Sequence, residues 1–338
     1  MVNIAVIGCG YWGPNLIRNF YQIENSHLKF ICDSNEARLN SIGRMYPHVA
    51  KTTNYKDVLN SKEVDAVVIA TPIHTHHPLA KEALEAGKHI LIEKPMTKSS
   101  MEAKELIDLA EKKGKILMVG HTFEYSPSVN KVKELLTGGT VGKLAHIEAR
   151  RHNLGRLQSD YNVVWDLAPH DISILLYTTG SAVDKVRAIT HKGYLINNTD
   201  SIAQIDVMLK NNVSAHLSMS WLYPKKMRDM TFIGDKKMIF YDDTDPVEKI
   251  RIYDKGVDNK FDVGEVAVSN TIYREGDVYI PHVSSVEPLR LECADFVESI
   301  SKNKKPMAHG NSGLQVVKVL EAIEKSASTG GHWVSIEE

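Results

Sequence analysis

The sequence contains no long apolar segment. Its longest apolar stretches, around Ala66–Ala70 and His89–Ile92, are far shorter than the roughly 20 residues of a membrane-spanning helix. Met1–Ile7 leads directly to a glycine-rich turn, without the basic segment and the small-residue cleavage site of a signal peptide. We therefore expect a cytoplasmic protein that is not associated with a membrane.

Cysteines are few, and neither sign of charge is in excess. The three cysteines, Cys9, Cys32 and Cys293, are odd in number, and their spacing fits neither a disulfide framework nor a zinc site, so we expect reduced thiols. With 41 Lys and Arg residues against 42 Asp and Glu residues, the net charge of −1 argues against a general nucleic-acid-binding protein. The 338 residues, 43% of them apolar, are enough for two globular domains.

Strand and helix patterns alternate over the first 120 residues. Short apolar runs predict strands at Asn3–Ile7, Leu28–Cys32, Val64–Ala70, Lys88–Ile92 and Ile116–Val119. Amphipathic spacing predicts helices at Gly13–Tyr21, Glu36–Met45, His77–Ala86 and Ser99–Lys113. Apolar strands that alternate with helices form a parallel sheet covered on both faces. We therefore predict an α/β fold that begins with a doubly wound Rossmann domain over residues 1–121.

The pattern changes after Gly120. Strands are predicted at Leu144–Arg151, Val183–His191, Ser201–Leu209, Val213–Trp221, Phe232-Ile233 and Met238–Tyr241. Helices are predicted near Ser128–Leu136, Asp166–Tyr177, Pro288–Ser301 and Asn311–Ser326. The residues Lys210-Asn211-Asn212 predict a hairpin turn between two of the strands. We expect an α+β domain over residues 122–338, with a large mixed, mostly antiparallel open sheet, for substrate binding and oligomerisation.

A glycine motif lies between the first predicted strand and the first helix. Gly8-Cys9-Gly10-Tyr11-Trp12-Gly13 matches G-x-G-x-x-G in the context that dinucleotide binding requires. Gly8 permits the tight turn, Gly10 lets a pyrophosphate approach the backbone, and Gly13 lets helix and strand pack closely. Phosphates would lie at the helix N-terminus, where N–H groups and the helix dipole favour anions. Tyr11 and Trp12 would pack over the cofactor or only over the first helix.

Asp33 follows the second predicted strand, 20 residues beyond Gly13. A carboxylate at this place accepts hydrogen bonds from the ribose hydroxyls of NAD and repels the 2′-phosphate of NADP. The alternative is a turn or cap residue before Ser34-Asn35. The combination of motif and acid predicts NAD as the cofactor.

Two further motifs end the next parallel strands. They are Ala70-Thr71-Pro72-Ile73-His74-Thr75-His76 and Glu93-Lys94-Pro95. Together with the glycine motif they resemble the glucose–fructose oxidoreductase, inositol dehydrogenase and MocA (Gfo/Idh/MocA) family, over nearly the whole chain. The resemblance implies that Thr71 and Pro72 line the nicotinamide side of the cofactor. It also implies that Glu93 and His76 lie near the cofactor, where His76 has a structural or cofactor-proximal role, and that Lys94 reaches into the active site.

The resemblance extends to the predicted helix after residue 161. The family carries an aspartate and a histidine four residues apart, which here are Asp166 and His170. By this resemblance Lys94, Asp166 and His170 form the catalytic set and contact the substrate. Two residues depart from the family pattern, Pro169 inside the pair and His121 where an asparagine is common. Because proline is tolerated only in the first helical turn, we expect the helix to start at about Asp166.

The residue types suit oxidation of a secondary alcohol. The ordinary pKa of histidine allows His170 to act as general base and acid. The Lys94 ammonium can orient the hydroxyl and stabilise a developing alkoxide. His74, His76 and His77 cluster at a strand-to-helix turn, but no cysteine or carboxylate lies near them in sequence, so we predict no metal site.

A basic segment, Arg150–Arg156, precedes the catalytic helix. Either these charges are solvated, or Arg151 and Arg156 bind carboxylate or phosphate oxygens of the substrate. The surrounding sequence resembles the UDP-N-acetylglucosamine-uronate 3-dehydrogenase subgroup, which implies oxidation of the 3-hydroxyl of a UDP-linked N-acetylhexosaminuronate for surface-polysaccharide biosynthesis.

Three alternatives remain open: a dehydrogenase of free sugars or inositols, a non-catalytic NAD-binding regulator and a structural partner subunit. The family also implies a homodimer or homotetramer that associates through the open sheet face, although that face is small and polar enough to be solvated. A small-molecule substrate is expected in every catalytic alternative.

Overall fold

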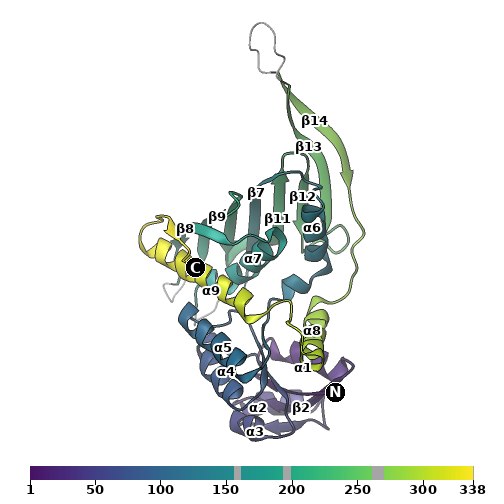
Figure 1. The fold of residues 1–338 in the computed structure, drawn as a ribbon, viewed down its shortest axis with the longest axis vertical. Coiled ribbons are helices and arrows are strands. Elements are labelled where there is room, and N and C mark those ends of the chain that lie inside the picture. The colour runs from purple at the N-terminus through teal and green to yellow at the C-terminus, as the bar shows by residue number, and fades with distance from the viewer. Residues whose placement is uncertain (156–160, 193–198, 261–269, 338) are drawn as a thin grey trace. The chain divides into compact units, whose positions relative to one another are not determined.

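The computed structural model describes residues 1–155, 161–192, 199–260 and 270–337 of the chain (Figure 1). Its internal contacts divide the chain into two compact units. The first unit consists of Met1–Ser126 and Val286–Glu321, and the second consists of Pro127–Ser285 and Ala322–Glu338. The segment Val286–Glu321 therefore belongs to the first unit. The sequence prediction had assigned all residues after 121 to one domain.

The first unit contains a six-stranded parallel sheet. Its strands are β1 (Val2–Ile7), β2 (Ser26–Cys32), β3 (Ala50–Thr52), β4 (Ala66–Ile69), β5 (His89–Ile92) and β6 (Leu117–Val119). They lie in the order β3-β2-β1-β4-β5-β6, and every pair is parallel. The order reverses between β1 and β4, where ligands bind at the carboxyl ends of such sheets. The predicted Rossmann fold is confirmed, although the short edge strand β3 was not predicted.

Helices cover this sheet. They are α1 (Gly13–Gln22), α2 (Glu36–Gly43), α3 (Tyr55–Asn60), the 3-10 turn η1 (Ile73–Thr75), α4 (His76–Glu85), α5 (Ser100–Lys113) and the 3-10 turn η2 (Thr122–Tyr125). α4 packs against α5, and α1 packs against α8 (Pro288–Lys302) (Figure 1). The Phe20 and Phe296 rings meet edge-on with centroids 6.2 Å apart, so α8 completes the apolar core of the first unit.

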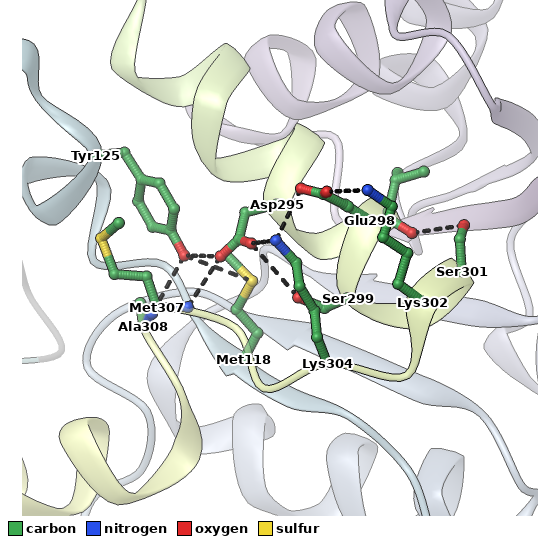
Figure 2. A network of polar contacts seen from close by, with 11 residues as sticks. Met118, Tyr125, Asp295, Glu298, Ser299, Ser301, Lys302, Lys304, Met307 and Ala308 are labelled. Carbon is green, nitrogen blue, oxygen red and sulfur yellow. Dashed lines mark hydrogen bonds and ion pairs between the residues drawn. The ribbon is translucent and has the colours of Figure 1, made fainter.

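A polar network fixes α8 and the segment after it to η2 (Figure 2). The Tyr125 hydroxyl donates to Asp295 Oδ2 at 2.8 Å and accepts the Ala308 N–H at 3.1 Å. Asp295 also accepts the Met307 N–H at 2.9 Å, and its other oxygen lies 3.2 Å from Lys304 Nζ. Because these bonds come from three separate segments, they set the position of α8 along its own axis. α9 (Gly310–Ser328) follows.

The second unit contains a nine-stranded sheet in the order β14-β13-β12-β11-β7-β10-β9-β8-β15. The strands are β7 (Leu144–Leu154), β8 (Val183–His191), β9 (Ile202–Leu209), β10 (Ser214–Ser220), β11 (Leu222–Gly234), β12 (Met238–Asp242), β13 (Ile250–Lys260), β14 (Asn270–Tyr279) and β15 (Val334–Ser335). β7 and β10 are parallel, and the other neighbours are antiparallel. This confirms the predicted mixed, mostly antiparallel sheet.

One face of the second sheet is apolar. α6 (Pro127–Thr137) and α7 (Val163–Thr179) pack against each other, and α7 also contacts β7, β9 and β10. In β10 the side chains Ala215, Leu217 and Met219 are buried, whereas His216 and Ser218 alternate with them on the half-exposed face. Buried apolar and half-exposed polar side chains thus alternate along β10 with the two-residue period of a strand. None of the helices in the described ranges is long and apolar enough to cross a membrane.

Candidate functional site

The glycine motif forms a turn that excludes side chains. Gly8 has φ +104°, and a Cβ added there would lie 2.4 Å from the Ala70 carbonyl oxygen. A Cβ at Gly13 would lie 1.9 Å from the Gly8 carbonyl oxygen, whereas a Cβ at Gly10 would meet nothing closer than the Arg38 guanidinium at 4.0 Å. Gly8 and Gly13 therefore permit the turn and the close helix, and Gly10 leaves the backbone accessible. This is the cradle that a dinucleotide pyrophosphate requires.

Asp33 lies beside this turn, at the end of β2. Its buried carboxylate accepts the Cys9 N–H at 2.7 Å and the Asn35 N–H at 2.8 Å. The Arg38 guanidinium lies 3.6 Å from Asp33 Oδ2. Asp33 is thus both a turn-forming residue and a carboxylate next to the glycine motif, so the two interpretations of the sequence are compatible.

The aromatic residues of the motif differ in their surroundings. Tyr11 is 81% exposed, whereas the Trp12 indole lies beside the Glu93 carboxyl group and opposes the rise that burial causes in its pKa. The contact joins the turn before α1 to the end of β5. A cofactor contact of either ring remains a prediction.

His76 connects the ends of β4 and β5. One ring nitrogen lies 2.8 Å from the Thr71 carbonyl oxygen, and the other lies 2.9 Å from the Pro95 carbonyl oxygen. Burial lowers the pKa of His76, whereas the hydrogen bonds to the Pro95 and Thr71 carbonyl oxygens oppose this shift, because a neutral ring could donate to only one of them. His76 therefore holds together the two segments that carry the Thr71-Pro72 and Glu93-Lys94-Pro95 motifs, which makes it a structural residue of the site.

The Glu93 carboxyl group is buried against the backbone of Gly120, where an added Cβ would lie 3.0 Å from its carboxyl carbon. Glu93 Oε2 accepts the Lys94 N–H at 3.2 Å. Burial raises the pKa of Glu93 to about 7, although the neighbouring Lys94 ammonium opposes this rise. Lys94 itself is half-buried and follows the carboxyl end of β5 by two residues, and its position in a ligand crevice stays a prediction.

The helix that carries Asp166 and His170 starts earlier than predicted. α7 begins at Val163, where the Asn162 side chain accepts two backbone N–H groups of the first turn at 3.1 and 3.2 Å. The prediction of a start at about Asp166 was wrong, because this cap fixes the first turn and Pro169 is accommodated inside the helix. An asparagine before an apolar run is a sequence signal for a helix start, and it outweighed the proline here.

Asp166 and His170 therefore lie one helical turn apart on the same side of α7. The Trp221 indole N–H donates to Asp166 Oδ2 at 2.9 Å and holds that carboxylate from the end of β10. Sequence reasoning did not identify this function of Trp221, because 55 residues separate the partners. Lys94 belongs to the first unit and the Asp166–His170 pair to the second, so their joint action is a prediction that kinetics must test.

The basic segment has partners within the second unit. The buried Arg151 guanidinium donates to Asp171 Oδ1 from Nε at 2.9 Å and from Nη2 at 2.6 Å. Arg150 Nε lies 2.9 Å from Asp229 Oδ1. Arg156 lies outside the described residues. A substrate contact of Arg151 remains a prediction, but its guanidinium already has a structural use.

Two family models match the chain. A model described as an oxidoreductase family with an NAD-binding Rossmann fold matches residues 2–121, and a model of the GFO/IDH/MocA C-terminal domain matches residues 129–240. The chain belongs to the Gfo/Idh/MocA family. It is accordingly an NAD-dependent dehydrogenase, and the glycine cradle with Asp33 would hold the NAD.

Relatives match over almost the full chain. The Bacillus subtilis protein YrbE, described as an uncharacterized oxidoreductase, is 26% identical, and the match covers 96% of this chain and 94% of YrbE. The UDP-N-acetylglucosamine 3-dehydrogenase of Acidithiobacillus ferrooxidans is 27% identical over 93% of each chain. A solved structure of that enzyme, GnnA, has a TM-score of 0.80 at 26% identity, covering 96% of this chain and 98% of the other. GenD2 of gentamicin A biosynthesis, solved with NAD, shares the fold with a TM-score of 0.84 at 20% identity, over 100% of this chain and 97% of GenD2.

We expect NAD to bind at least about tenfold more tightly than NADP, because the Asp33 carboxylate would repel a 2′-phosphate. Replacement of Asp33 by alanine should reduce or reverse the preference for NAD over NADP. The Arg38 guanidinium could then bind the 2′-phosphate of NADP without a carboxylate beside it. Fluorescence titration with both cofactors measures this ratio. Glu36→Ala, an exposed acid in the first turn of α2, is the matched control and should leave the ratio unchanged. Equal or tighter binding of NADP to the unaltered protein would show that Asp33 does not select the cofactor.

Proposed function

We propose that this dehydrogenase oxidises a secondary hydroxyl group of a sugar, with Lys94, Asp166 and His170 as the catalytic set. His170 takes the hydroxyl proton as general base. The Lys94 ammonium orients the substrate oxygen and stabilises its developing negative charge. Asp166, held by Trp221, orients the imidazole or the substrate. Bound NAD supplies the hydride acceptor, so the products are a ketone, NADH and one proton.

The substrate that we propose is a UDP-linked N-acetylhexosaminuronate, oxidised at the 3-hydroxyl in a route to surface polysaccharides. The observation that carries the nucleotide-sugar part is the similarity, over 93% of both chains, to a protein named UDP-N-acetylglucosamine 3-dehydrogenase. The uronate part depends on the basic segment. Of its arginines, Arg151 and Arg156 are the two that we propose to bind a carboxylate or diphosphate oxygen of the substrate.

The alternatives make different demands on the site. A dehydrogenase of free sugars or inositols would use the same catalytic residues without a site for the nucleotide. A non-catalytic NAD-binding regulator would have no need of Lys94, Asp166 and His170 together, and all three are present. We also propose a homodimer or homotetramer, formed through the half-exposed face of the second sheet.

A substrate panel separates these functions. UDP-linked N-acetylhexosamines and their uronates should produce NADH, detected by absorbance, whereas glucose and inositol should produce little. The product trapped as an oxime should have lost two hydrogens by mass spectrometry. Good turnover of free glucose or inositol without turnover of UDP-sugars would contradict the nucleotide-sugar proposal and leave the dehydrogenase intact. NAD binding without turnover of any panel member would favour the regulator.

A further inference from the structure

Trp221 connects three elements of the second unit. It follows β10, and its backbone N–H donates to the carbonyl oxygen of Ser201, just before β9, at 2.9 Å. Its own carbonyl oxygen accepts the N–H of Gly155, just after β7, at 3.4 Å. Its indole N–H donates to Asp166 Oδ2 on α7 at 2.9 Å. Trp221 therefore joins the helix of the proposed catalytic pair to two strands of the sheet.

The first turn of α7 is tied to the same part of the sheet by a separate contact. The Val163 N–H donates to the Asp200 carbonyl oxygen at 3.0 Å, and Asp200 directly precedes Ser201. None of these backbone bonds involves the indole of Trp221. A substitution that changes only the Trp221 side chain therefore removes the contact with Asp166 and leaves the backbone bonds of both partners in place.

The two partners differ in their exposure. Trp221 is only 1% exposed, and it continues the buried row of Leu217 and Met219 on the apolar face of β10. Asp166 and His170 are both half-buried, so part of each residue stays accessible to solvent. The indole thus holds the Asp166 carboxylate from the core of the second unit.

An indole N–H has two properties that suit it to this position. It donates a hydrogen bond but cannot accept one, and it carries no charge. Its bond to a carboxylate is charge-assisted and therefore stronger than a bond between neutral groups. A lysine or arginine in the same place would bring a positive charge next to Asp166. Trp221 orients the carboxylate without adding such a charge.

We propose that Trp221 is a positioning residue of the active site, which orients Asp166 through its indole N–H and acts on catalysis only through that carboxylate. In the proposed reaction His170 takes the proton of the substrate hydroxyl and becomes positively charged. A carboxylate held in a fixed orientation one helical turn away stabilises that imidazolium. This inference rests on the proposed roles of Asp166 and His170, and it gives Trp221 no contact with the substrate.

Ultraviolet resonance Raman spectroscopy tests the contact on the protein alone. The indole N–H band of Trp221 is obtained as the difference between the unaltered protein and Trp221→Phe, and it should have the position of a hydrogen-bonded indole. The same difference measured in the Asp166→Ala background should give the band of an indole without this bond. Neither NAD nor substrate is needed. An identical band position in the two backgrounds would overturn the proposal.

A double-mutant cycle tests whether Trp221 acts through Asp166. Trp221→Phe alone should lower kcat/KM by about tenfold to a hundredfold, the equivalent of one hydrogen bond to a charged group. In the Asp166→Ala background the same substitution should lower kcat/KM by less than about twofold, because the acceptor is already lost. UDP-N-acetylglucosaminuronate, or the fastest substrate of the panel, is the probe. Equal losses in the two backgrounds would contradict the proposal, because a role in packing predicts the same loss in both.

Trp165→Phe is the matched control. Trp165 is also buried and lies next to Asp166 on α7, but its indole makes no hydrogen bond with the described residues. The substitution removes the same atoms from the second unit and should leave kcat/KM close to that of the unaltered enzyme. A loss as large as that of Trp221→Phe would show that side-chain volume, and not the bond to Asp166, is what matters.

The proposed function and this inference fail separately. If Asp166→Ala turns over as fast as the unaltered enzyme, the catalytic role of Asp166 fails, and the role of Trp221 fails with it whatever the Raman band shows. If Asp166→Ala is impaired and Trp221→Phe is not, only the role of Trp221 fails.

Discussion

Replacement of Lys94 by methionine should lower turnover by roughly two or more orders of magnitude and leave NAD binding intact. Methionine keeps the length of the side chain and removes the charge that stabilises the alkoxide in the transition state. His170→Asn should have an effect of similar size, because it removes the general base. Steady-state kinetics with the panel substrate and fluorescence titration with NAD measure the two quantities.

The control for this experiment is Lys81→Met. Lys81 lies on α4 of the same unit and pairs with Glu105 at 2.5 Å on the surface, so the same substitution should leave turnover unchanged. Turnover close to that of the unaltered enzyme in Lys94→Met or His170→Asn would remove that residue from the mechanism. Loss of NAD binding would instead assign the residue a structural role.

Arg151→Met should destabilise the second unit by about 3–5 kcal/mol. The substitution leaves the Asp171 carboxylate buried without its cation, which bonds it at 2.6 and 2.9 Å. Urea unfolding followed by tryptophan fluorescence measures the change. The signal reports mainly the second unit, because Trp165, Trp221 and Trp333 belong to it.

Arg187→Met, on β8 of the same sheet, is the matched control. Its ion pair with Asp206, at 2.7 Å, is 52% exposed on the arginine side, so its loss should cost less than about 1 kcal/mol. A double variant that also replaces Asp171 by leucine should recover part of the stability lost in Arg151→Met, since no charge then remains unpaired. Equal effects of the Arg151 and Arg187 substitutions would show that the buried pair contributes no more than a surface pair.

The sequence predicted those structural features that are determined by residues close together along the chain. The glycine motif, Asp33 and the alternating strands are local patterns, and each is set by backbone geometry or by burial of one face. The Asp166–His170 pair was proposed from the family resemblance and not from spacing alone. The family resemblance, not any periodicity, identified Lys94 as a candidate.

The features that the sequence did not predict depend on contacts between segments far apart along the chain. The Trp221–Asp166 hydrogen bond and the Arg151–Asp171 ion pair join residues that no local pattern relates. An arginine in a basic segment looks solvated or ligand-binding until the carboxylate opposite it is known. β13 and β14 were missed because charged residues and glycines interrupt their two-residue period. Glu292 resembles any polar residue of an amphipathic helix, since only the fold shows that it faces the core.

The return of Val286–Glu321 to the first unit has a consequence for synthesis of the protein on the ribosome. The chain passes between the two units three times, so neither unit is one continuous piece of the chain. The core around Phe20 cannot close until Phe296 and Val297 have been made, after most of the second unit. Until α8 has been synthesised, part of the apolar surface of the Rossmann sheet therefore stays exposed to solvent. A gene fragment that ends at residue 121 would encode the cofactor motif without α8, the helix that completes the apolar core of the first unit.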